Sequence, residues 1–418
     1  MLNPGLASIV LATASISALI YIAYLYAINR TRLAVHLKRK GYHRCPHYQH
    51  KDFLFGSDWR DSLVVASIAG TRQQWYREQF ATYGKTFETR IWGKRIFQTC
   101  DPANVQAELT APATDVGAGP SRAGLLSWLG RGAFTMDGEF WRRSREMLKP
   151  VFKRTAISDM SRLERHLARL FDELEREGLE VDLQSHFIRM FLDFTMDLLI
   201  GEDVNTINKE ASKIDVASFL TACDESQLQV VRSAQPWIVR WWKGWTKTWN
   251  QPLDATQGFI GRYVDSAVQD FETKEGGPIK RSDAFIDELI REAGSKDKTY
   301  LRDQILNVFM PGRDSVAIEI THVMLYLSQN PTVYEKVRAE VLAAGFRDDR
   351  EISYDSLKTL PYVNAVVNEA LRLGGPPNGQ TVRDILSDIV LPRGGGAHGD
   401  QPILIPKGSV LYTQIRSM

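Results

Sequence analysis

The stretch Leu301–Asn330, LRDQILNVFMPGRDSVAIEITHVMLYLSQN, decides the fold. Apolar residues recur along it at helical spacing, which predicts one long buried helix. Pro311 lies in its middle and has no N–H to donate to the carbonyl of Asn307, a loss that costs roughly 3 kcal/mol in a helix interior. Gly312 follows and relaxes the backbone further, so we expect the helix to be broken or kinked here.

An acid and an alcohol, Asp314 and Ser315, follow directly after the expected break. Where the helical ladder is open and water can enter, adjacent carboxylate and hydroxyl groups are suited to passing protons to something bound against the helix. The alternative is a proline-kinked core helix in which these two residues act only as a cap-like pair. The residues alone leave both interpretations open.

Composition and charge exclude several classes of protein. The chain has 418 residues, of which 44% are hydrophobic and 24% charged, enough for one large domain or two smaller ones. A net charge of +2, without a dense Lys/Arg stripe, argues against a nucleic-acid binder. The three cysteines, Cys45, Cys100 and Cys223, are far apart and predict neither a disulfide framework nor a paired metal site. A reducing compartment fits this pattern best.

The N-terminus predicts a membrane anchor. Residues 1–29 carry no charged side chain, and the apolar run from Leu6 to Ile28 can cross a bilayer of ~30 Å with some tilt. Basic residues follow the run, whereas a cleaved signal peptide carries its charge before a shorter run. The positive-inside bias then places the rest of the chain on the cytosolic side. We expect a single-pass anchor at 1–29 and a basic, Pro-containing linker at 30–58; the alternative is an apolar N-terminal core helix.

The remaining sequence is mostly helical in pattern. Residues 86–100 alternate around a Gly-Lys turn and predict a hairpin. Residues 110–132 are rich in Ala, Gly, Pro and Ser and predict a mobile loop. Helices are expected at 61–83, 101–109, 134–154, 159–177, 183–201, 258–271, 283–293, 331–344 and 352–373, and strands at 388–391, 403–405 and 409–415.

Three further groups of residues carry functional hypotheses. Trp141 and Arg145 are four residues apart on one helix face and form a donor pair for a carboxylate or phosphate, unless this is only a basic surface helix. Glu369 and Arg372 can pair on another helix, where an isolated solvated pair contributes little. Residues 236–249 hold five tryptophans among basic residues, which suits either a membrane interface or packing against a neighbouring helix.

Taken together, these elements resemble a cytochrome P-450, a haem-thiolate monooxygenase, over nearly the whole chain. Pro311–Val316 resembles the oxygen-activating helix of that family, usually Ala/Gly-Gly-x-Asp/Glu-Thr-Thr. Glu369–Arg372 matches its Glu-x-x-Arg motif, and Trp141-x-x-x-Arg145 matches the helix that holds a haem propionate. Arg383 falls where the family places another propionate-binding arginine.

The resemblance implies a mainly α fold with small β-sheets (α+β), with residues 59–418 as the catalytic domain. It implies haem b as the cofactor and electrons from NADPH delivered by NADPH-cytochrome P-450 reductase. Its residue roles, carried over by motif, are proton relay by Asp314 and Ser315, propionate binding by Trp141, Arg145 and Arg383, and structural support by Gly312, Glu369 and Arg372.

Within the family, the chain is most similar to fungal members that hydroxylate n-alkanes and fatty acids. Gly41–Asp58, Leu301–Asp314 and Leu391–Gly396 carry this similarity. It implies a single-pass anchor in the endoplasmic reticulum membrane, a cytosolic catalytic domain and a long-chain apolar substrate entering from the bilayer. Residues 113–130 and 219–229 are then expected to shape the substrate pocket.

The relay motif departs from the family pattern. Ser315 keeps the hydroxyl of the family's threonine but loses the methyl group that stiffens χ1. Val316 removes the second alcohol, and Pro311 replaces a small residue. We expect a working but leakier relay, with more peroxide lost per turnover.

The iron ligand is the second departure. The family's cysteine loop lies downstream of the β region in which this sequence ends, and Cys45, Cys100 and Cys223 lack its context. Without a thiolate the iron lacks the electron push that favours O–O cleavage. We also expect Glu369 and Arg372 to form a buried, under-satisfied pair. The two interpretations are a monooxygenase whose sequence is incomplete here, and a truncated, catalytically inactive membrane-anchored remnant.

Overall fold

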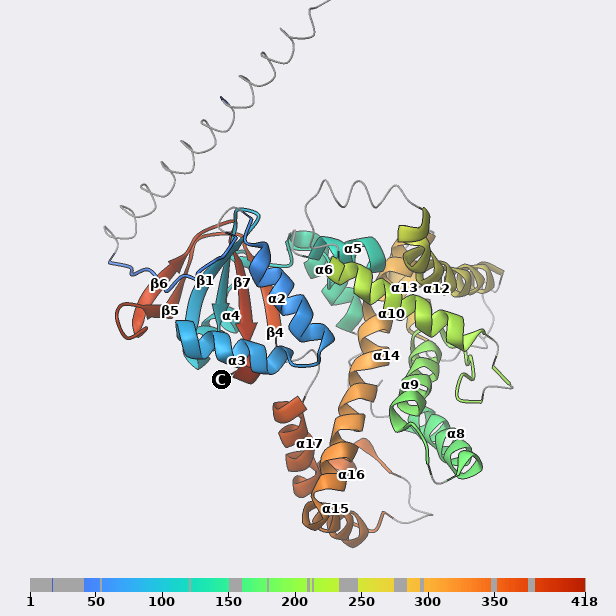
Figure 1. Cartoon of the computed structure of the whole chain (residues 1–418). Helices are drawn as coiled ribbons and strands as arrows, with labels where there is room; N and C mark the ends of the chain where they lie inside the picture. Colours follow the sequence, from blue (N-terminus) through green and yellow to red (C-terminus); the bar gives the residue numbers. More distant parts are fainter. Residues whose placement is uncertain are drawn as a thin grey trace, which may run out of the picture. The chain divides into compact units, whose positions relative to one another are not determined.

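The chain forms two compact units, which are described separately (Figure 1). The strand-rich unit comprises Met1–Ala111, Ser387–Tyr412 and Ser417–Met418, and the helical unit comprises Pro112–Leu386 and Thr413–Arg416. The computed structural model describes residue 17 and residues 41–52, 55–119, 122–149, 160–178, 180–208, 211–212, 214–232, 247–273, 284–293, 297–346, 352–374 and 380–417.

Two antiparallel hairpins form the sheets of the strand-rich unit. β1 (Thr86–Ile91) pairs with β2 (Lys94–Thr99), as the sequence predicts. Trp92 and Gly93 between them both have positive φ, 52° and 76°, which is the backbone of the tight turn that matches strand twist. β5 (Ile389–Gly395) pairs with β6 (Gln401–Ile405), and β7 (Val410–Gln414) lies next to β2.

An aromatic cluster fills the space between these strands and their helices. α2 (Ser57–Ile68) and α3 (Arg72–Tyr83) contribute Trp59 and Tyr76, which pack with Phe87 of β1. α4 (Pro102–Thr110) is held against β5 by Asn104, whose amide exchanges two 3.0 Å hydrogen bonds with the backbone of Arg393. The segment 41–52 is tied to both hairpins, because the Tyr48 N–H donates to the Glu88 carbonyl at 2.8 Å and His43 N–H to Pro402 at 3.2 Å.

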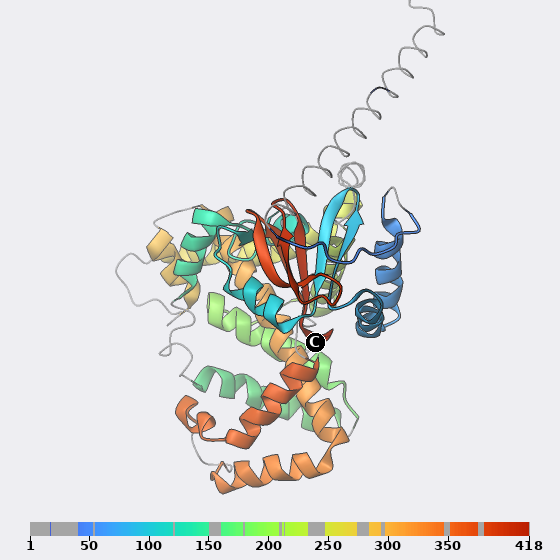
Figure 2. The ribbon, with the colours of Figure 1, turned by 90° about the vertical axis from the view of Figure 1, so that its left-hand side faces the viewer.

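The helical unit is built around one long helix, α14 (Lys298–Gln329), which runs along its length in Figures 1 and 2. α14 packs against α9, α12 and α17. The other described elements are α5 (Ala123–Leu129), α6 (Gly138–Leu148), α8 (Ser161–Glu177), α9 (Leu183–Ile200), α10 (Val216–Arg232), α12 (Lys247–Thr273), α13 (Phe285–Ala293), α15 (Pro331–Ala343), α16 (Tyr354–Lys358), α17 (Pro361–Gly374), the strands β3 (Val116–Gly117) and β4 (Gln380–Ile385), and the short 3-10 helix η3 (Ile415–Ser417).

The main core lies where α9, α10, α12 and α13 meet the first half of α14. Leu301, Ile305 and Phe309 of α14 are fully buried there, together with Met196 of α9 and Ile260 of α12. Their spacing along α14 is the apolar stripe that the sequence predicts.

Two expectations are wrong. α14 passes through Pro311 as one continuous helix, so the predicted break is absent, whereas the predicted kink stays a prediction. A proline removes one ladder bond, and the packing of the flanking turns against α9 maintains the helix across it. Residues 110–132 are not simply a loop, since they contain β3 and α5. Short elements of this kind are fixed by tertiary contacts, which a Gly- and Ala-rich composition conceals.

The expected anchor and most of the tryptophan-rich segment, residues 233–246, lie outside the described residues, apart from residue 17. Among the residues that the structure describes, none belongs to a helix with the length and apolarity needed to cross a bilayer.

Candidate functional site

α14 positions Asp314 and Ser315 through caps and packing. At its N-terminus, the Asp297 carboxylate accepts the N–H groups of Thr299 and Tyr300 at 3.0 and 3.1 Å, a standard cap of a helix start. Beside the site, α14 approaches α9 so closely that a Cβ on Gly312 would lie 3.4 Å from Thr195 Cγ2. That distance is an ordinary van der Waals contact, so the space at Gly312 would also admit an alanine.

The Asp314 carboxylate is held from two helices. The Arg313 Nε donates to one oxygen at 2.5 Å, and the Gln227 amide of α10 donates to the other at 2.8 Å. Arg313 is only 2% exposed, whereas Asp314 retains 20% exposure. Ser315, the next residue, is half-buried. Both predicted relay residues thus lie at the edge of the core, one of them firmly oriented.

Arg313 has Cys223 and Asp224 of α10 as neighbours besides Asp314. Burial alone would lower the pKa of Arg313, but Cys223, Asp314 and Asp224 raise it above its usual value. Its Nη1 is buried without a hydrogen-bond partner among the described residues. The guanidinium is therefore a fixed positive charge behind Asp314.

Trp141 and Arg145 share one face of α6, as the sequence predicts. The Arg145 guanidinium lies over the Trp141 ring at 5.4 Å, a cation–π contact. Within the described parts of the chain, no carboxylate pairs with Arg145, and Trp141 is half-buried beside it. These donors are available for an anionic group from outside.

Strand β3 pairs with β4, and the residues directly after β3 are hydrogen-bonded to the start of α6. Strand β4 carries the half-buried Arg383. Asp137, immediately before α6, accepts the N–H groups of Ala118 and Gly119 at 2.6 and 2.8 Å. These residues directly follow β3, and Gly117 of β3 pairs with Asp384 of β4. The start of the Trp141 helix and the Arg383 strand are thereby fixed to one another within the helical unit.

Glu369 and Arg372 pair on α17, but not in the buried setting that we expected. Arg372 donates to both Glu369 oxygens, at 2.7 and 2.6 Å. The two side chains are 54% and 66% exposed, so the expectation of a buried, under-satisfied pair is wrong. Val367 and Leu371 on the predicted apolar side of α17 are exposed as well.

The family is settled by sequence comparison. A model of the family Cytochrome P450 matches residues 62–418. This chain belongs to the cytochrome P450 family. Among relatives, it is 32% identical over 385 residues to Cytochrome P450 monooxygenase apdE of Emericella nidulans, covering 90% of this chain and 71% of that protein. It is 32% identical over 382 residues to Cytochrome P450 52A12 of Debaryomyces hansenii, covering 87% and 72%.

This P450 chain spans only part of its relatives. It is 33% identical over 346 residues to Cytochrome P450 52A4 of Candida maltosa, covering 79% of this chain and 63% of that protein. Among solved structures, a cytochrome P450 (CYP102L1) matches with a TM-score of 0.65 at 22% identity, covering 83% of this chain and 77% of that chain. The cytochrome P450DA heme domain matches with a TM-score of 0.70 at 17% identity, covering 90% and 78%. These likenesses confirm the P450 fold.

The three cysteines of this P450 chain are ordinary buried thiols. All are unpaired, as the sequence predicts. Burial raises the pKa of Cys45 to about 12 and the pKa values of Cys100 and Cys223 to about 11. A bound metal would deprotonate a thiol in any case, so it is sequence context that counts against the three as an iron ligand: all precede α14, and none lies in a segment like the family's cysteine loop.

Sequence reasoning missed two residues that orient Asp314. Arg313 was visible in the sequence as a charge next to Asp314 in an otherwise apolar stretch, and a charge at such a position requires a partner when it is buried. Gln227 gave no signal, because it lies 87 residues away on another helix.

Proposed function

We propose that this chain is the membrane-anchored catalytic part of a haem-dependent monooxygenase that hydroxylates a long-chain apolar substrate of the n-alkane or fatty-acid type. Dioxygen and NADPH-derived electrons, delivered by NADPH-cytochrome P-450 reductase, are the co-substrates. The observation that carries the proposal is the family match over residues 62–418. The choice of substrate class rests on the resemblance of Leu301–Asp314 and Leu391–Gly396 to fungal alkane and fatty-acid hydroxylases.

The donors on α6 fit the carboxylate groups of a haem. An indole N–H and a guanidinium side by side bind one carboxylate through charge-assisted hydrogen bonds. Arg145 has no acidic partner among the described residues that would compete for it. In this proposal Trp141, Arg145 and Arg383 hold the two propionates, and Glu369 and Arg372 brace the core. The haem, when bound, supplies the iron at which dioxygen is activated, and its thiolate ligand is not one of Cys45, Cys100 or Cys223.

Proton delivery is the proposed task of Asp314 and Ser315. Each Asp314 oxygen already accepts one hydrogen bond, from Arg313 or from Gln227, and keeps a second lone pair for water. The remaining 20% exposure gives solvent protons access to this carboxylate. Asp314 takes a proton from water, and the Ser315 hydroxyl, both donor and acceptor, orients the water that passes it on.

The aromatic face of α10 suits an apolar substrate. Phe219 lies 4.1 Å from Phe259 of α12 and 6.2 Å from Phe309 of α14, measured between ring centroids. A cavity of about 620 Å³ opens between α10 and α12. Phe219, Phe259 and Tyr263 line it together with polar side chains, among them Glu202, Asp215 and Arg262. We infer that α10, with residues 113–130, shapes the binding pocket, since a flexible hydrocarbon gains most from burial against aromatic surface.

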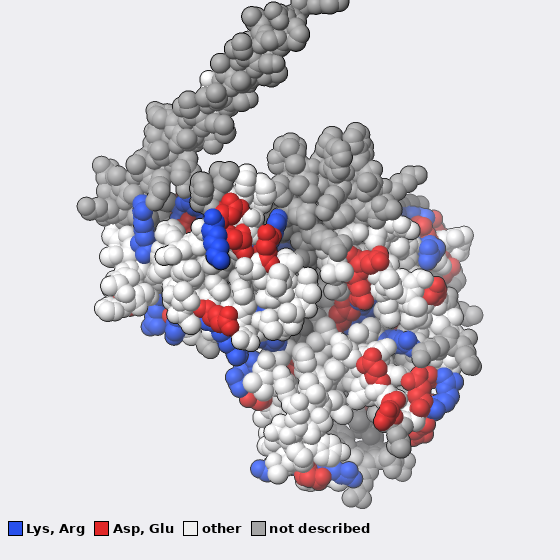
Figure 3. Space-filling view, viewed as in Figure 1, with Lys and Arg blue, Asp and Glu red and all other residues white. Residues whose placement is uncertain are grey.

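Membrane attachment at the endoplasmic reticulum is the final part of the proposal. Residues 1–29 are its proposed single-pass anchor, with the catalytic part in the cytosol. Val65 and Ile68 of α2 are 67% and 83% exposed. Phe55 and Trp92 are also exposed and pack on each other, with 4.6 Å between their ring centroids. Exposed apolar side chains of this kind suit contact with a lipid surface. Lysine, arginine, aspartate and glutamate side chains are interspersed elsewhere on the described face in Figure 3.

Haem content and the carbon monoxide spectrum test this function. The protein is isolated from the membranes of cells that produce it, and haem is measured per protein. We expect about one haem per protein, and the carbon monoxide band of a thiolate-ligated haem where the protein of the producing cells supplies a cysteine beyond Cys45, Cys100 and Cys223. The absence of haem would contradict the proposal. Arg145→Leu should lower the haem content, while Arg142→Leu, which removes an exposed arginine paired with Glu139 on the same helix, should not.

A further inference from the structure

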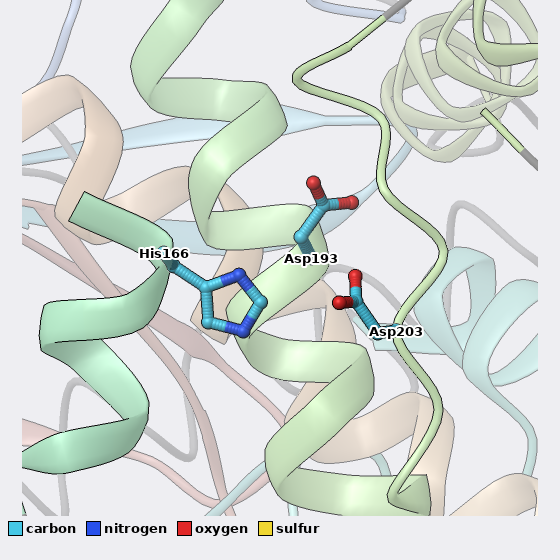
Figure 4. Close-up of side chains that lie close together, drawn as sticks. All are labelled: His166, Asp193 and Asp203. Carbon is cyan, nitrogen blue, oxygen red and sulfur yellow. The ribbon is translucent and has the colours of Figure 1, made fainter. Parts of the chain in front are cut away.

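A second cluster of polar side chains lies away from the proposed P450 site, between α8, α9 and the segment after α9. His166 of α8, Asp193 of α9 and Asp203 each present a ligand atom, and these atoms lie within 4.8 Å of one another. Figure 4 shows the nitrogen-bearing edge of the imidazole turned toward the two carboxylates. None of the three residues has a role in the proposed monooxygenase reaction.

His166 is completely buried, and only one of its nitrogens has a partner. Its Nε2 lies 3.1 Å from an Asp197 oxygen. Arg162 and Arg165 also contact the Asp197 carboxylate, at 3.6 and 3.4 Å, and their charges favour its ionised form. Because the ionised carboxylate can only accept, Nε2 carries the proton. Nδ1 is buried without a hydrogen-bond partner among the described residues, and in the neutral ring it presents a lone pair.

Asp193 is an uncompensated buried carboxylate. Its two oxygens accept the N–H groups of Thr206 and Ile207 at 2.8 and 3.1 Å. Among the described residues, no cationic side chain contacts it, although it is fully buried. Each oxygen keeps one lone pair that the backbone does not use. The side chain therefore holds negative charge in a place where a cation would stabilise it.

Asp203 is the accessible member of the cluster. Its side chain is 29% exposed. One of its oxygens accepts the Asn205 N–H at 3.1 Å, and the other contacts Arg169. A bound ion would share this carboxylate with the Arg169 guanidinium. Asp203 thus gives the buried nitrogen and carboxylate a route to solvent.

We propose that His166 Nδ1, Asp193 and Asp203 bind one divalent transition-metal ion of the Zn²⁺ or Mn²⁺ type. One imidazole nitrogen and two carboxylate oxygens are a ligand set that such ions accept. Asp197 completes the pattern, because metal-binding histidines usually donate their second ring N–H to a carboxylate. The ion links α8, α9 and the segment after α9, so its role is structural. The competing occupant is an ordered water molecule.

Zn²⁺ binding to the whole chain, purified in detergent and stripped with a chelator, tests the site. A competing chelator gives the affinity of each tight site. Asp203→Asn removes an accessible ligand with little risk to folding, and we expect it to weaken one site more than about tenfold. Asp197→Asn should weaken the same site about 10- to 100-fold, because it frees the His166 ring. His186→Gln is the matched control, since this buried histidine lies against Asp182 and Glu177 instead.

Mn²⁺ distinguishes the cluster from adventitious binding by other histidines. Pulsed electron paramagnetic resonance of bound Mn²⁺ detects a directly coordinated imidazole nitrogen. We expect that coupling in the wild-type chain and in His186→Gln, and we expect its loss in His166→Gln. Equal Zn²⁺ affinity and stoichiometry in wild type and Asp203→Asn would overturn the proposal. So would a nitrogen coupling that survives in a folded His166→Gln variant. Either result would indicate that a water molecule, and not a metal ion, occupies the cluster.

Discussion

Two of the Arg–carboxylate pairs in the helical unit lie in opposite surroundings. On α14, Arg313 and Asp314 are 2% and 20% exposed and are joined by Gln227 of α10. On α17, Glu369 and Arg372 are 54% and 66% exposed, although Arg372 donates two short hydrogen bonds. The number of hydrogen bonds alone would rank the α17 pair as the stronger, because it has two and the Arg313–Asp314 pair has one. Burial reverses that order, because water screens an exposed pair and a buried charge without its partner is strongly destabilising.

The largest expected effect is on Arg313. Arg313→Leu leaves Asp314 and Asp224 without their shared guanidinium at the edge of the core. We expect the free energy of unfolding to fall by about 3 kcal/mol, measured from the denaturant midpoint. The double change Arg313→Leu, Asp314→Leu should recover part of that loss, because it removes the unpaired charge as well. If Arg313→Leu has the same midpoint as wild type, the pair is not the buried anchor that we describe.

Gln227 should have a smaller effect on stability but a clear effect on orientation. Gln227→Ala removes one hydrogen bond to the Asp314 carboxylate, and this exposed contact is worth about 0.5 kcal/mol. Leu228→Ala, at the exposed neighbouring position, serves as the control. The proposed relay predicts less product per NADPH consumed in Gln227→Ala and an unchanged ratio in Leu228→Ala. An unchanged ratio in both variants would show that Gln227 does not position Asp314.

Ser315 tests the relay without changing the charge. Ser315→Thr adds the methyl group that restricts χ1, and the free energy of unfolding should change by no more than about 0.5 kcal/mol. We expect more product and less peroxide per NADPH consumed, because the hydroxyl is held in fewer orientations. If the ratio of product to NADPH does not rise, the leakier relay inferred from Ser315 is wrong.

The smallest effect is expected on α17. The hydrogen bond from Arg372 lowers the pKa of Glu369, and both groups are fully solvated. The pair's contribution to the free energy of unfolding is therefore fully present at pH values above the ordinary glutamate pKa. It disappears as the pH falls through the lowered pKa of Glu369. Arg372→Gln should return the Glu369 pKa to its ordinary range in an NMR titration, with no measurable change in the thermal midpoint at neutral pH. A large loss of stability would place the pair in a buried setting after all.

Local patterns in the sequence predicted much of the fold. The apolar stripe of α14, the hairpin around Trp92–Gly93 and the four-residue spacing of Trp141 and Arg145 are all present. Each depends on residues close together in the chain. The prediction of a break at Pro311 is wrong because α9 packs against α14, and this contact joins segments that are distant in the sequence. The free-energy cost of a proline inside a helix follows from a local rule, whereas whether the helix breaks there depends on the surrounding core.

The candidate sites show the same limit. Asp314 could be identified from its motif, but its partners could not. Arg313 precedes it in the chain, and Gln227 lies far away in the sequence on α10. The cluster of His166, Asp193 and Asp203 has no sequence signature, because two of its members are separated by an entire helix. The feature that points to this cluster is the buried Nδ1 of His166 without a partner among the described residues, and it can be seen only in the structure.

The central claim is that Asp314, oriented by Arg313 and Gln227, delivers protons in a P450 reaction. The most direct measurement compares Asp314→Asn with Asp224→Asn, a carboxylate that also neighbours Arg313, in protein isolated from producing cells. Substrate turnover, product formed per NADPH and the solvent isotope effect are recorded together. We predict a loss on the order of 100-fold in turnover for Asp314→Asn and near-wild-type values for Asp224→Asn. Wild-type turnover and isotope effect in Asp314→Asn would contradict the account.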